Sequence, residues 1–205
     1  TETMIVMATG CMEVVSTPYP ETAWELPWVH CAFENAAAVA SGVKAALLAK
    51  GDIKTNVIAI GGDGAMFDIG FGAISGAVER GHKILYISTD NEAYQNTGIQ
   101  RSGATFPYAA TTTSPNGKLI HGKTQPKKPL PFIIAAHGAK YVATASVANL
   151  FDLKNKVQKA LATEGPSYIS VFVPCIPGWK IDSSITLDVS RMAQDTCAYP
   201  IYEIE

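Results

Sequence analysis

Short apolar runs recur along the chain, and each stops at glycine, aspartate, alanine or proline. Runs of this kind, bounded by turn residues, are typical of buried strands. The predicted strands are Met4–Met7, Asn56–Ile60, Lys83–Thr89, Tyr141–Thr144 and Tyr168–Val173. Other stretches have apolar residues at helical spacing. The predicted helices are Ala32–Lys50, Ile69–Arg80, a small-residue helix ending near Gly138, and Val147–Thr163.

The alternation of strands and helices sets the expected fold class. Because the strands are continuous apolar runs, both faces of their sheet must be covered. We therefore predict a single α/β domain over residues 1–205, with a mostly parallel sheet and helices on both faces. From Pro174 onward the pattern is irregular, with one short helix expected around Val189–Gln194. Residues 174–205 are therefore predicted to form an irregular tail.

Three unusual segments follow predicted strands. They are Gly61–Gly64, Asp90–Asn96 and Pro174–Trp179. The second of them opens a long polar stretch that reaches Gly117, and a loop of that length in a compact domain is usually functional. In open α/β sheets, ligands bind beyond the carboxyl ends of the strands. The three segments are therefore expected to meet at one edge of the sheet and to form the binding site there.

Composition and charge exclude some classes of protein. Of the 205 residues, 47% are hydrophobic and 17% are charged, which is a globular composition. The net charge is −2 and no basic cluster occurs, so nothing favours nucleic-acid binding. No apolar run approaches the roughly 20 residues that span a bilayer. No signal peptide is visible, and a cytoplasmic location without membrane contact is expected.

The segment Gly62-Asp63-Gly64 separates a predicted strand from a predicted helix. The glycines let a ligand approach the backbone, and the start of a helix favours an anionic phosphate. The carboxylate of Asp63 is a hard oxygen ligand of the kind that Mg²⁺ prefers. Taken alone, the segment also fits an ordinary turn.

The position of Asn91 adds to this interpretation. The 26 residues 65–90 separate Gly64 from Asn91, and they hold one predicted helix and one predicted strand. The two ends of this unit therefore return to the same edge of the sheet. The amide oxygen of Asn91 and the carbonyl oxygen of Ala93 can complete a metal shell begun by Asp63. This spacing resembles the thiamine diphosphate motif.

A longer resemblance lies in the run Asp90–Thr105, which reads DNEAYQNTGIQRSGAT. It is similar to the corresponding loop of the β subunits of pyruvate:ferredoxin oxidoreductase and its relatives. Further stretches agree with this family over nearly the whole chain. They are Ala8–Val14, Pro27–Ser41, Thr111–Pro115, Ala135–Gly138 and Pro174–Trp179. The resemblance implies the thiamine-diphosphate-binding fold for this chain.

The resemblance also assigns roles to individual residues. It implies that the side chains of Asp63 and Asn91 and the carbonyl of Ala93 bind Mg²⁺, and that Gly62 and Gly64 contact the diphosphate. It places Asn96 near the reacting carbon of the cofactor and the substrate. Thr97 and Gly98 then shape the same pocket. For Asn96 alone, a turn residue in left-handed conformation is the alternative reading.

The four cysteines are Cys11, Cys31, Cys175 and Cys197. The family binds a [4Fe–4S] cluster with four thiolates of this subunit. By resemblance Cys11 and Cys175 are two of them, and an N-terminal CxxC supplies the others. This chain has no CxxC, so cluster binding by these residues alone is open. Cys197 is a possible substitute ligand, whereas Cys31 is expected in a helical stretch of the core.

The implied reaction is oxidative decarboxylation of a 2-oxoacid. Electrons pass to the cluster and then to ferredoxin, and coenzyme A takes the acyl group. The family's α-type subunit supplies the glutamate that activates the cofactor, so Glu34 and Glu92 are not assigned that role. Partner subunits of α, γ and δ type are expected, the δ type being ferredoxin-like, with the active site at an interface beside the aromatic loop Tyr19–Trp28.

Alternatives within and beyond the family remain open at this point. Pyruvate is the expected substrate, but branched-chain 2-oxoacids or oxalate are compatible with the same loop. A thiamine diphosphate decarboxylase or synthase without a cluster would share Gly62–Gly64 and Asn91. A binding or regulatory subunit could also keep the fold without catalysis. A dinucleotide-binding enzyme is not supported, because the chain has no GxGxxG followed by an acidic residue placed for ribose.

Overall fold

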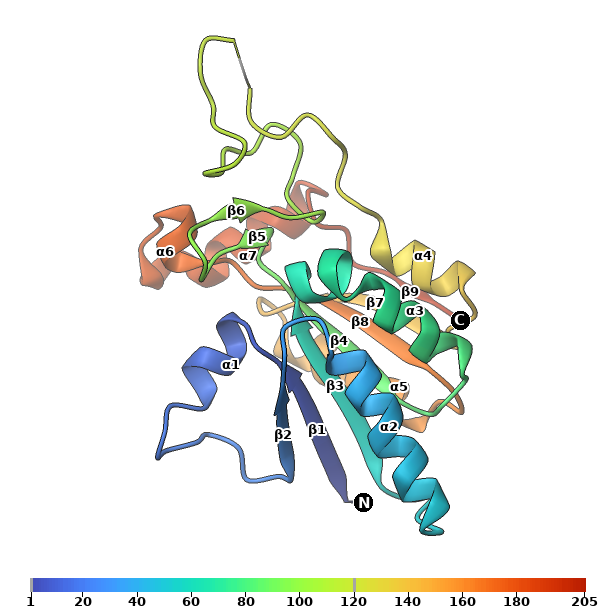
Figure 1. Ribbon diagram of the computed structural model, residues 1–205. Coiled ribbons are helices and arrows are strands. Elements are labelled where there is room, and N and C mark those ends of the chain that lie inside the picture. The colour runs from blue at the N-terminus through green and yellow to red at the C-terminus, as the bar shows by residue number, and fades with distance from the viewer. Residues whose placement is uncertain (1, 120) are drawn as a thin grey trace.

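Seven strands form one sheet at the centre of the molecule (Figure 1). The computed structural model describes residues 2–119 and 121–205; Thr1 and Ile120 lie outside the described residues. The order is β2-β1-β3-β4-β8-β7-β9, and neighbours are parallel except for β9, which runs antiparallel to β7. The strands are β1 (Thr3–Ala8), β2 (Trp28–Cys31), β3 (Asn56–Gly62), β4 (Leu85–Asp90), β7 (Tyr141–Ser146), β8 (Ser167–Phe172) and β9 (Glu203–Ile204). The predicted mostly parallel sheet is confirmed.

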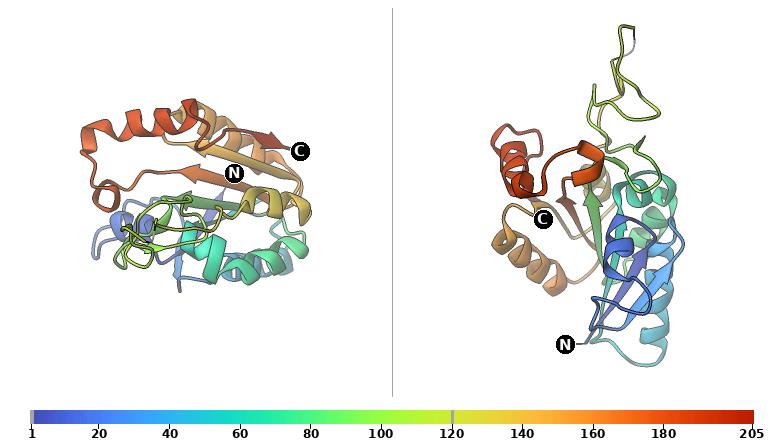
Figure 2. Two further views of the ribbon diagram at one scale, coloured as in Figure 1. Left: turned by 90° about the horizontal axis from the view of Figure 1, so that it is seen from above. Right: turned by 90° about the vertical axis from the view of Figure 1, so that its left-hand side faces the viewer.

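Helices cover both faces of this sheet, as predicted (Figure 2). On one face lie α2 (Ala36–Ala49), α3 (Phe71–Glu79) and α4 (Leu130–Ala136), and α5 (Leu150–Ala162) lies on the other. The alternation of side chains along a strand explains this division. In β4, Tyr86 belongs to the core cluster under α2, α3 and α4, whereas its neighbour Leu85 belongs to the cluster under α5.

Local sequence explains where two of the helices begin or end. The side chain of Asn149 accepts a hydrogen bond of 3.0 Å from the backbone N–H of Asp152, which caps the first turn of α5. Just beyond the C-terminal end of α2, Gly51 has φ of 79°, a left-handed conformation that glycine adopts without strain.

Two N-terminal segments differ from the prediction. The aromatic stretch before Ala32 ends in strand β2, so Cys31 is the last residue of an edge strand and not part of a helix. It is half-buried and packs against the core cluster of α2. Cys11 begins a short helix, α1 (Cys11–Ser16). The strand was missed because the proline- and aromatic-rich stretch before it resembles a loop, and only pairing with β1 orders it.

The tail from Pro174 is more regular than predicted, although the short helix expected around Val189–Gln194 is present. Residues from Pro174 form α6 (Ile176–Trp179), a 3₁₀ turn (Ser183–Ile185), α7 (Thr186–Asp195) and β9. Tyr199 anchors this segment, since its hydroxyl lies 2.8 Å from the Ser170 hydroxyl and its ring lies 4.8 Å from that of Phe172. These contacts join residues distant in sequence, which explains why local periodicity did not indicate them.

The segment after β4 lies at the carboxyl edge of the sheet. It contains the hairpin of β5 (Ala93–Tyr94) and β6 (Gln100–Arg101), and then an arm that rises away from the sheet before α4 (Figure 1). The loops after β1, β3 and β8 reach the same edge. No helix within residues 2–119 and 121–205 combines the length and apolar character needed to cross a membrane.

Candidate thiamine diphosphate and magnesium site

The glycine turn lies where β3 ends. Asp63 precedes a single turn of π-helix, Gly64–Ile69, which leads into α3; the sequence had suggested one continuous α-helix from Ile69. A Cβ on Gly64 would stand 2.3 Å from Cε1 of Tyr94, so no larger residue fits beneath that ring. A Cβ on Gly62 would meet no atom within 4 Å. The backbone at Gly62 therefore borders open space, as a diphosphate cradle requires.

Asp63, Asn91 and Ala93 meet beside this turn. One atom of the Asn91 amide group lies 3.1 Å from Asp63 Oδ1 and 2.9 Å from the carbonyl oxygen of Ala93. When that atom is the amide nitrogen, it donates a hydrogen bond to each oxygen. When the amide is turned over, three oxygens face one another, and only a cation between them stabilises that arrangement.

The separations of these oxygens suit Mg²⁺. An octahedral ion with bonds of about 2.1 Å holds neighbouring ligands roughly 3 Å apart. The side chain of Asp63 is buried, and this burial, together with the charge of Asp90, raises its pKa well above the usual range. A divalent cation would supply the charge that stabilises the buried carboxylate. The predicted ligands therefore fit the metal in both geometry and electrostatics.

One cavity collects most of the predicted site residues. Gly62, Asp63, Gly64, Asn91, Ala93, Asn96 and Thr97 line it, together with Cys11 and the aromatic rings of Phe33 and Tyr94. Gly98 is not among the lining residues; it has φ of 120° and lies between the two strands of the β5–β6 hairpin. The structure thus brings together residues from four separate segments.

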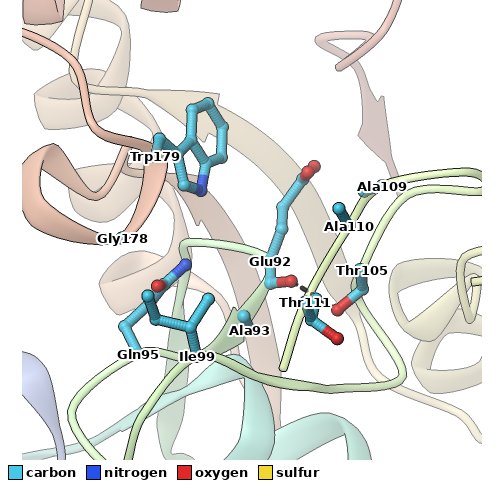
Figure 3. A pocket seen from close by; sticks show the side chains of 10 residues that line it. All are labelled: Glu92, Ala93, Gln95, Ile99, Thr105, Ala109, Ala110, Thr111, Gly178 and Trp179. Atoms are coloured by element: carbon cyan, nitrogen blue, oxygen red, sulfur yellow. Dashed lines mark hydrogen bonds between the residues drawn. The ribbon is translucent and has the colours of Figure 1, made fainter. Parts of the chain in front are cut away.

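A second cavity, of about 350 Å³, adjoins the first (Figure 3). Ala93 and Gln95 line both cavities, and the second is also lined by Glu92, Thr105 and Trp179. Burial raises the pKa of Glu92 to about 7, although the adjacent ammonium group of Lys127 lowers it. The Lys127 nitrogen lies 3.0 Å from Glu92 and 2.7 Å from the buried Asp90. Glu92 therefore pairs with a lysine and does not line the glycine cavity.

Cys11 and Cys175 both lie near the carboxyl edge of the sheet. Cys11 lines the first cavity, and Cys175 directly precedes α6. Burial raises the pKa of the Cys175 thiol, the N–H of Gly178 lowers it, and the nearby Cys11 and Asp63 raise it further. Cys197 is exposed. Within residues 2–119 and 121–205, no three His, Cys, Asp or Glu side chains are grouped to hold a metal.

Sequence reasoning did not assign roles to several residues that contact the predicted metal ligands. The carbonyl oxygen of Asn91 accepts hydrogen bonds from Gln95 Nε2 at 2.9 Å and from Trp179 Nε1 at 3.2 Å. The Ser102 hydroxyl donates to Asp63 Oδ2. Gln95 and Ser102 lie within Asp90–Thr105, and Trp179 lies within Pro174–Trp179; both stretches resemble the family. The spacing of these residues along the sequence does not indicate the contacts.

Comparison with known proteins identifies the family of this chain. Residues 8–171 match the family described as thiamine pyrophosphate enzyme, C-terminal TPP binding domain. Pyruvate synthase subunit PorB of Methanothermobacter thermautotrophicus is 57% identical over 203 residues, which are 99% of this chain and 70% of that protein. The chain belongs to the β subunits of the 2-oxoacid:ferredoxin oxidoreductases.

Other members of this oxidoreductase family are also similar. Ketoisovalerate oxidoreductase subunit VorB of Pyrococcus abyssi is 43% identical over 210 residues, covering all of this chain and 67% of that protein. A solved 2-oxoglutarate:ferredoxin oxidoreductase from Magnetococcus marinus matches with a TM-score of 0.73 and 28% identity. That match covers 94% of this chain and 60% of the solved chain. The family membership and the thiamine-diphosphate-binding fold expected from the sequence are confirmed.

Proposed function

We propose that this chain is the thiamine-diphosphate- and Mg²⁺-binding part of a 2-oxoacid:ferredoxin oxidoreductase that acts on pyruvate. The observation that carries the proposal is the convergence of Asp63, Asn91 and Ala93 at octahedral separations beside the glycine turn. When bound, thiamine diphosphate supplies the electron sink for decarboxylation of the 2-oxoacid. The residues of this chain hold and orient that group.

The predicted site residues of the cavity then have defined tasks. Asp63 Oδ1, the amide oxygen of Asn91 and the carbonyl of Ala93 bind Mg²⁺. Gly62 leaves room for the diphosphate, and Gly64 lets the Tyr94 ring pack against the turn. Asn96 and Thr97 line the same cavity, so their polar side chains are available to orient the substrate. Gly98 acts indirectly, by allowing the hairpin turn that presents Asn96 and Thr97.

We assign Cys11 and Cys175 as two ligands of a [4Fe–4S] cluster, which would accept electrons one at a time. The position of both residues at the carboxyl edge supports this assignment, since Cys11 lines the cavity of the glycine turn and Cys175 directly precedes α6. They are half of a ligand set, and the described residues group no further metal-binding side chains with them. The other thiolates of such a cluster must therefore come from outside this set.

The activating glutamate is assigned to an α-type partner subunit. The cavity lined by Gly62–Gly64 includes no glutamate among its described residues, and Glu92 is paired with Lys127. The active site would then lie between subunits, with γ-type and ferredoxin-like δ-type subunits completing the complex and with ferredoxin and coenzyme A as further partners. The loop before β2 offers a contact surface, since Tyr19 is 99% exposed.

The identity of the substrate is the part of the proposal that depends most on the relatives. The similar pyruvate synthase subunit is 57% identical, and the similar ketoisovalerate oxidoreductase subunit is 43% identical. We therefore favour pyruvate and keep a branched-chain 2-oxoacid as the second candidate.

The experiment is a substrate panel on the full-length protein in its native complex, purified without oxygen. Pyruvate, 2-oxoisovalerate, 2-oxoglutarate and oxalate are each tested for reduction of a viologen dye, with and without coenzyme A. Reduction by pyruvate that needs coenzyme A is the expected result, whereas preference for another acid would replace the substrate. No reduction with any acid, despite bound thiamine diphosphate, would indicate a thiamine enzyme without a cluster.

A further inference from the structure

A short turn, Ser102-Gly103-Ala104-Thr105, packs directly behind the metal ligands. Ser102 and Thr105 are each 1% exposed, although they lie in the loop that follows the β5–β6 hairpin. Hydroxyl groups that are buried to this degree normally have specific hydrogen-bond partners. The partners of these two hydroxyls lie on the two segments that supply the metal ligands.

Ser102 determines which oxygen of Asp63 is free. Its hydroxyl accepts a hydrogen bond of 3.1 Å from the N–H of Ala104, so its own proton is directed to Asp63 Oδ2. The other oxygen, Oδ1, is the one that faces Asn91 and Ala93. Because Oδ2 is occupied by the serine, Asp63 presents a single oxygen to a cation in a fixed direction.

Thr105 holds the second ligand segment. Its hydroxyl donates to the carbonyl oxygen of Glu92, the residue between Asn91 and Ala93 (Figure 3). Glu92 has φ of 67°, a left-handed conformation that is unfavourable for a residue with a long side chain. The same hydroxyl accepts a hydrogen bond of 2.9 Å from the N–H of Ser102. The two residues of this clamp, Ser102 and Thr105, are therefore hydrogen-bonded to each other.

A buried lysine holds the turn itself. Lys123 is 1% exposed, and its ammonium group donates to the carbonyls of Thr105 at 2.7 Å, Pro126 at 3.0 Å and Gly103 at 3.3 Å. A buried charge is costly unless it is well hydrogen-bonded, so three carbonyls at these distances define one position for the turn. On its other side, the N–H of Gly103 donates to Asp68 at 2.7 Å.

We propose that Ser102 and Thr105 are positioning residues that hold Asp63 and the Asn91–Ala93 segment at the spacing Mg²⁺ requires. This inference rests on the proposed function. Residues behind metal ligands typically contribute 10- to 100-fold to metal affinity. Because Mg²⁺ demands near-ideal octahedral geometry and Ca²⁺ does not, loss of the clamp lowers the affinity for Mg²⁺ more than that for Ca²⁺.

The test compares isosteric variants of the full-length protein in its native complex. Dissociation constants for Mg²⁺ and for Ca²⁺ are measured by calorimetry at saturating thiamine diphosphate for wild type, Ser102→Ala and Thr105→Val. Thr105→Ser keeps the hydroxyl and serves as the rescue. Ser190→Ala and Thr144→Val are matched controls, since both residues are buried and hydrogen-bonded away from the site.

The expected result is a roughly 10- to 100-fold weaker Mg²⁺ affinity in Ser102→Ala and Thr105→Val, with a lower preference for Mg²⁺ over Ca²⁺. Thr105→Ser and both controls should behave as wild type. Wild-type affinity in both hydroxyl-free variants would overturn the inference, and so would an equal loss for the two ions, which marks general destabilisation. If the wild type bound no Mg²⁺ with thiamine diphosphate, the proposed function itself would fail, and this inference with it.

Discussion

At the scale of single residues, Asp63 is the side chain on which the proposed metal site depends most. It is the one carboxylate among the three oxygen donors, and its two oxygens have different neighbours. Burial and Asp90 raise its pKa, so the metal-free protein holds this group in an unfavourable environment. Mg²⁺ binding would relieve that cost, which gives the site a physical reason to bind a divalent cation.

Replacing Asp63 with asparagine keeps the shape of the side chain and removes its charge. We expect Asp63→Asn to weaken Mg²⁺-dependent binding of thiamine diphosphate by at least roughly 100-fold, or about 2.7 kcal/mol. Calorimetry with and without Mg²⁺ measures this effect. Asp188→Asn is the control, because Asp188 lies on the surface in an ion pair with Arg191. Equal affinity in Asp63→Asn and wild type would remove Asp63 from the ligand set.

The roles proposed for the cysteines can also be tested one residue at a time. We expect Cys175→Ser in the full-length complex to abolish or alter the spectrum of the reduced iron–sulfur cluster, measured by electron paramagnetic resonance, because serine replaces a thiolate ligand. Cys197→Ser should leave the spectrum unchanged, since Cys197 is exposed. A spectrum altered by Cys197→Ser but not by Cys175→Ser would reverse the assignment of the two residues.

At the scale of elements, the junction between the glycine turn and α3 is closely packed against backbone atoms. A Cβ on Gly70 would stand 2.2 Å from the carbonyl oxygen of Ala65 and 2.7 Å from that of Glu34. Both contacts are with backbone atoms, which cannot rotate away. Two residues later, a Cβ on Gly72 would meet no atom within 4 Å. A substitution at Gly72 can therefore serve as the control for the same substitution at Gly70.

We expect Gly70→Ala to destabilise the protein by about 1–3 kcal/mol, as overpacking generally does. Gly72→Ala should be neutral or stabilise by about 0.4–1 kcal/mol, because alanine reduces the entropy of the unfolded chain. Denaturant unfolding of the full-length protein measures both values. If the two variants were equally stable, the packing described for this junction would be incorrect.

At the scale of the whole molecule, Lys127 joins three distant segments. Its ammonium group pairs with Asp90 at the end of β4 and with Glu92 beyond it, and it lies 5.3 Å from the centre of the Tyr199 ring in the C-terminal segment. Asp90 is completely buried. The lysine thereby fixes the end of the long arm and the C-terminal segment against the carboxyl edge of the sheet, next to the proposed metal ligands.

Lys127→Met should therefore destabilise the protein more than the loss of a surface ion pair does. Removal of one partner from a buried pair typically destabilises a protein by about 3–5 kcal/mol, because the remaining charge is left without compensation. Lys83→Met is the control, since Lys83 pairs with the exposed Glu164, and such a pair contributes roughly 0–1 kcal/mol. Thermal unfolding of both variants tests the difference, and similar losses would contradict this role of Lys127.

The sequence by itself determined the order of most strands and helices, the parallel sheet, and the association of Gly62–Gly64 with Asn91 and Ala93. These features depend on local periodicity and on the spacing within one strand–helix–strand unit, and both can be read along the chain. The errors at β2, at the π-helical turn and in the C-terminal segment have a common cause. Each of these segments is ordered by partners that lie elsewhere in the fold.

Only the tertiary structure decided how the proposed metal ligands are supported. Ser102 meets Asp63 across 39 positions of sequence, and Trp179 meets the carbonyl of Asn91 across 88. Lys123 is a polar residue in a polar segment, yet it is buried among three carbonyls. Such contacts leave no periodic pattern, because a hydrogen bond depends on where two chain segments meet in space and not on the residues that flank them.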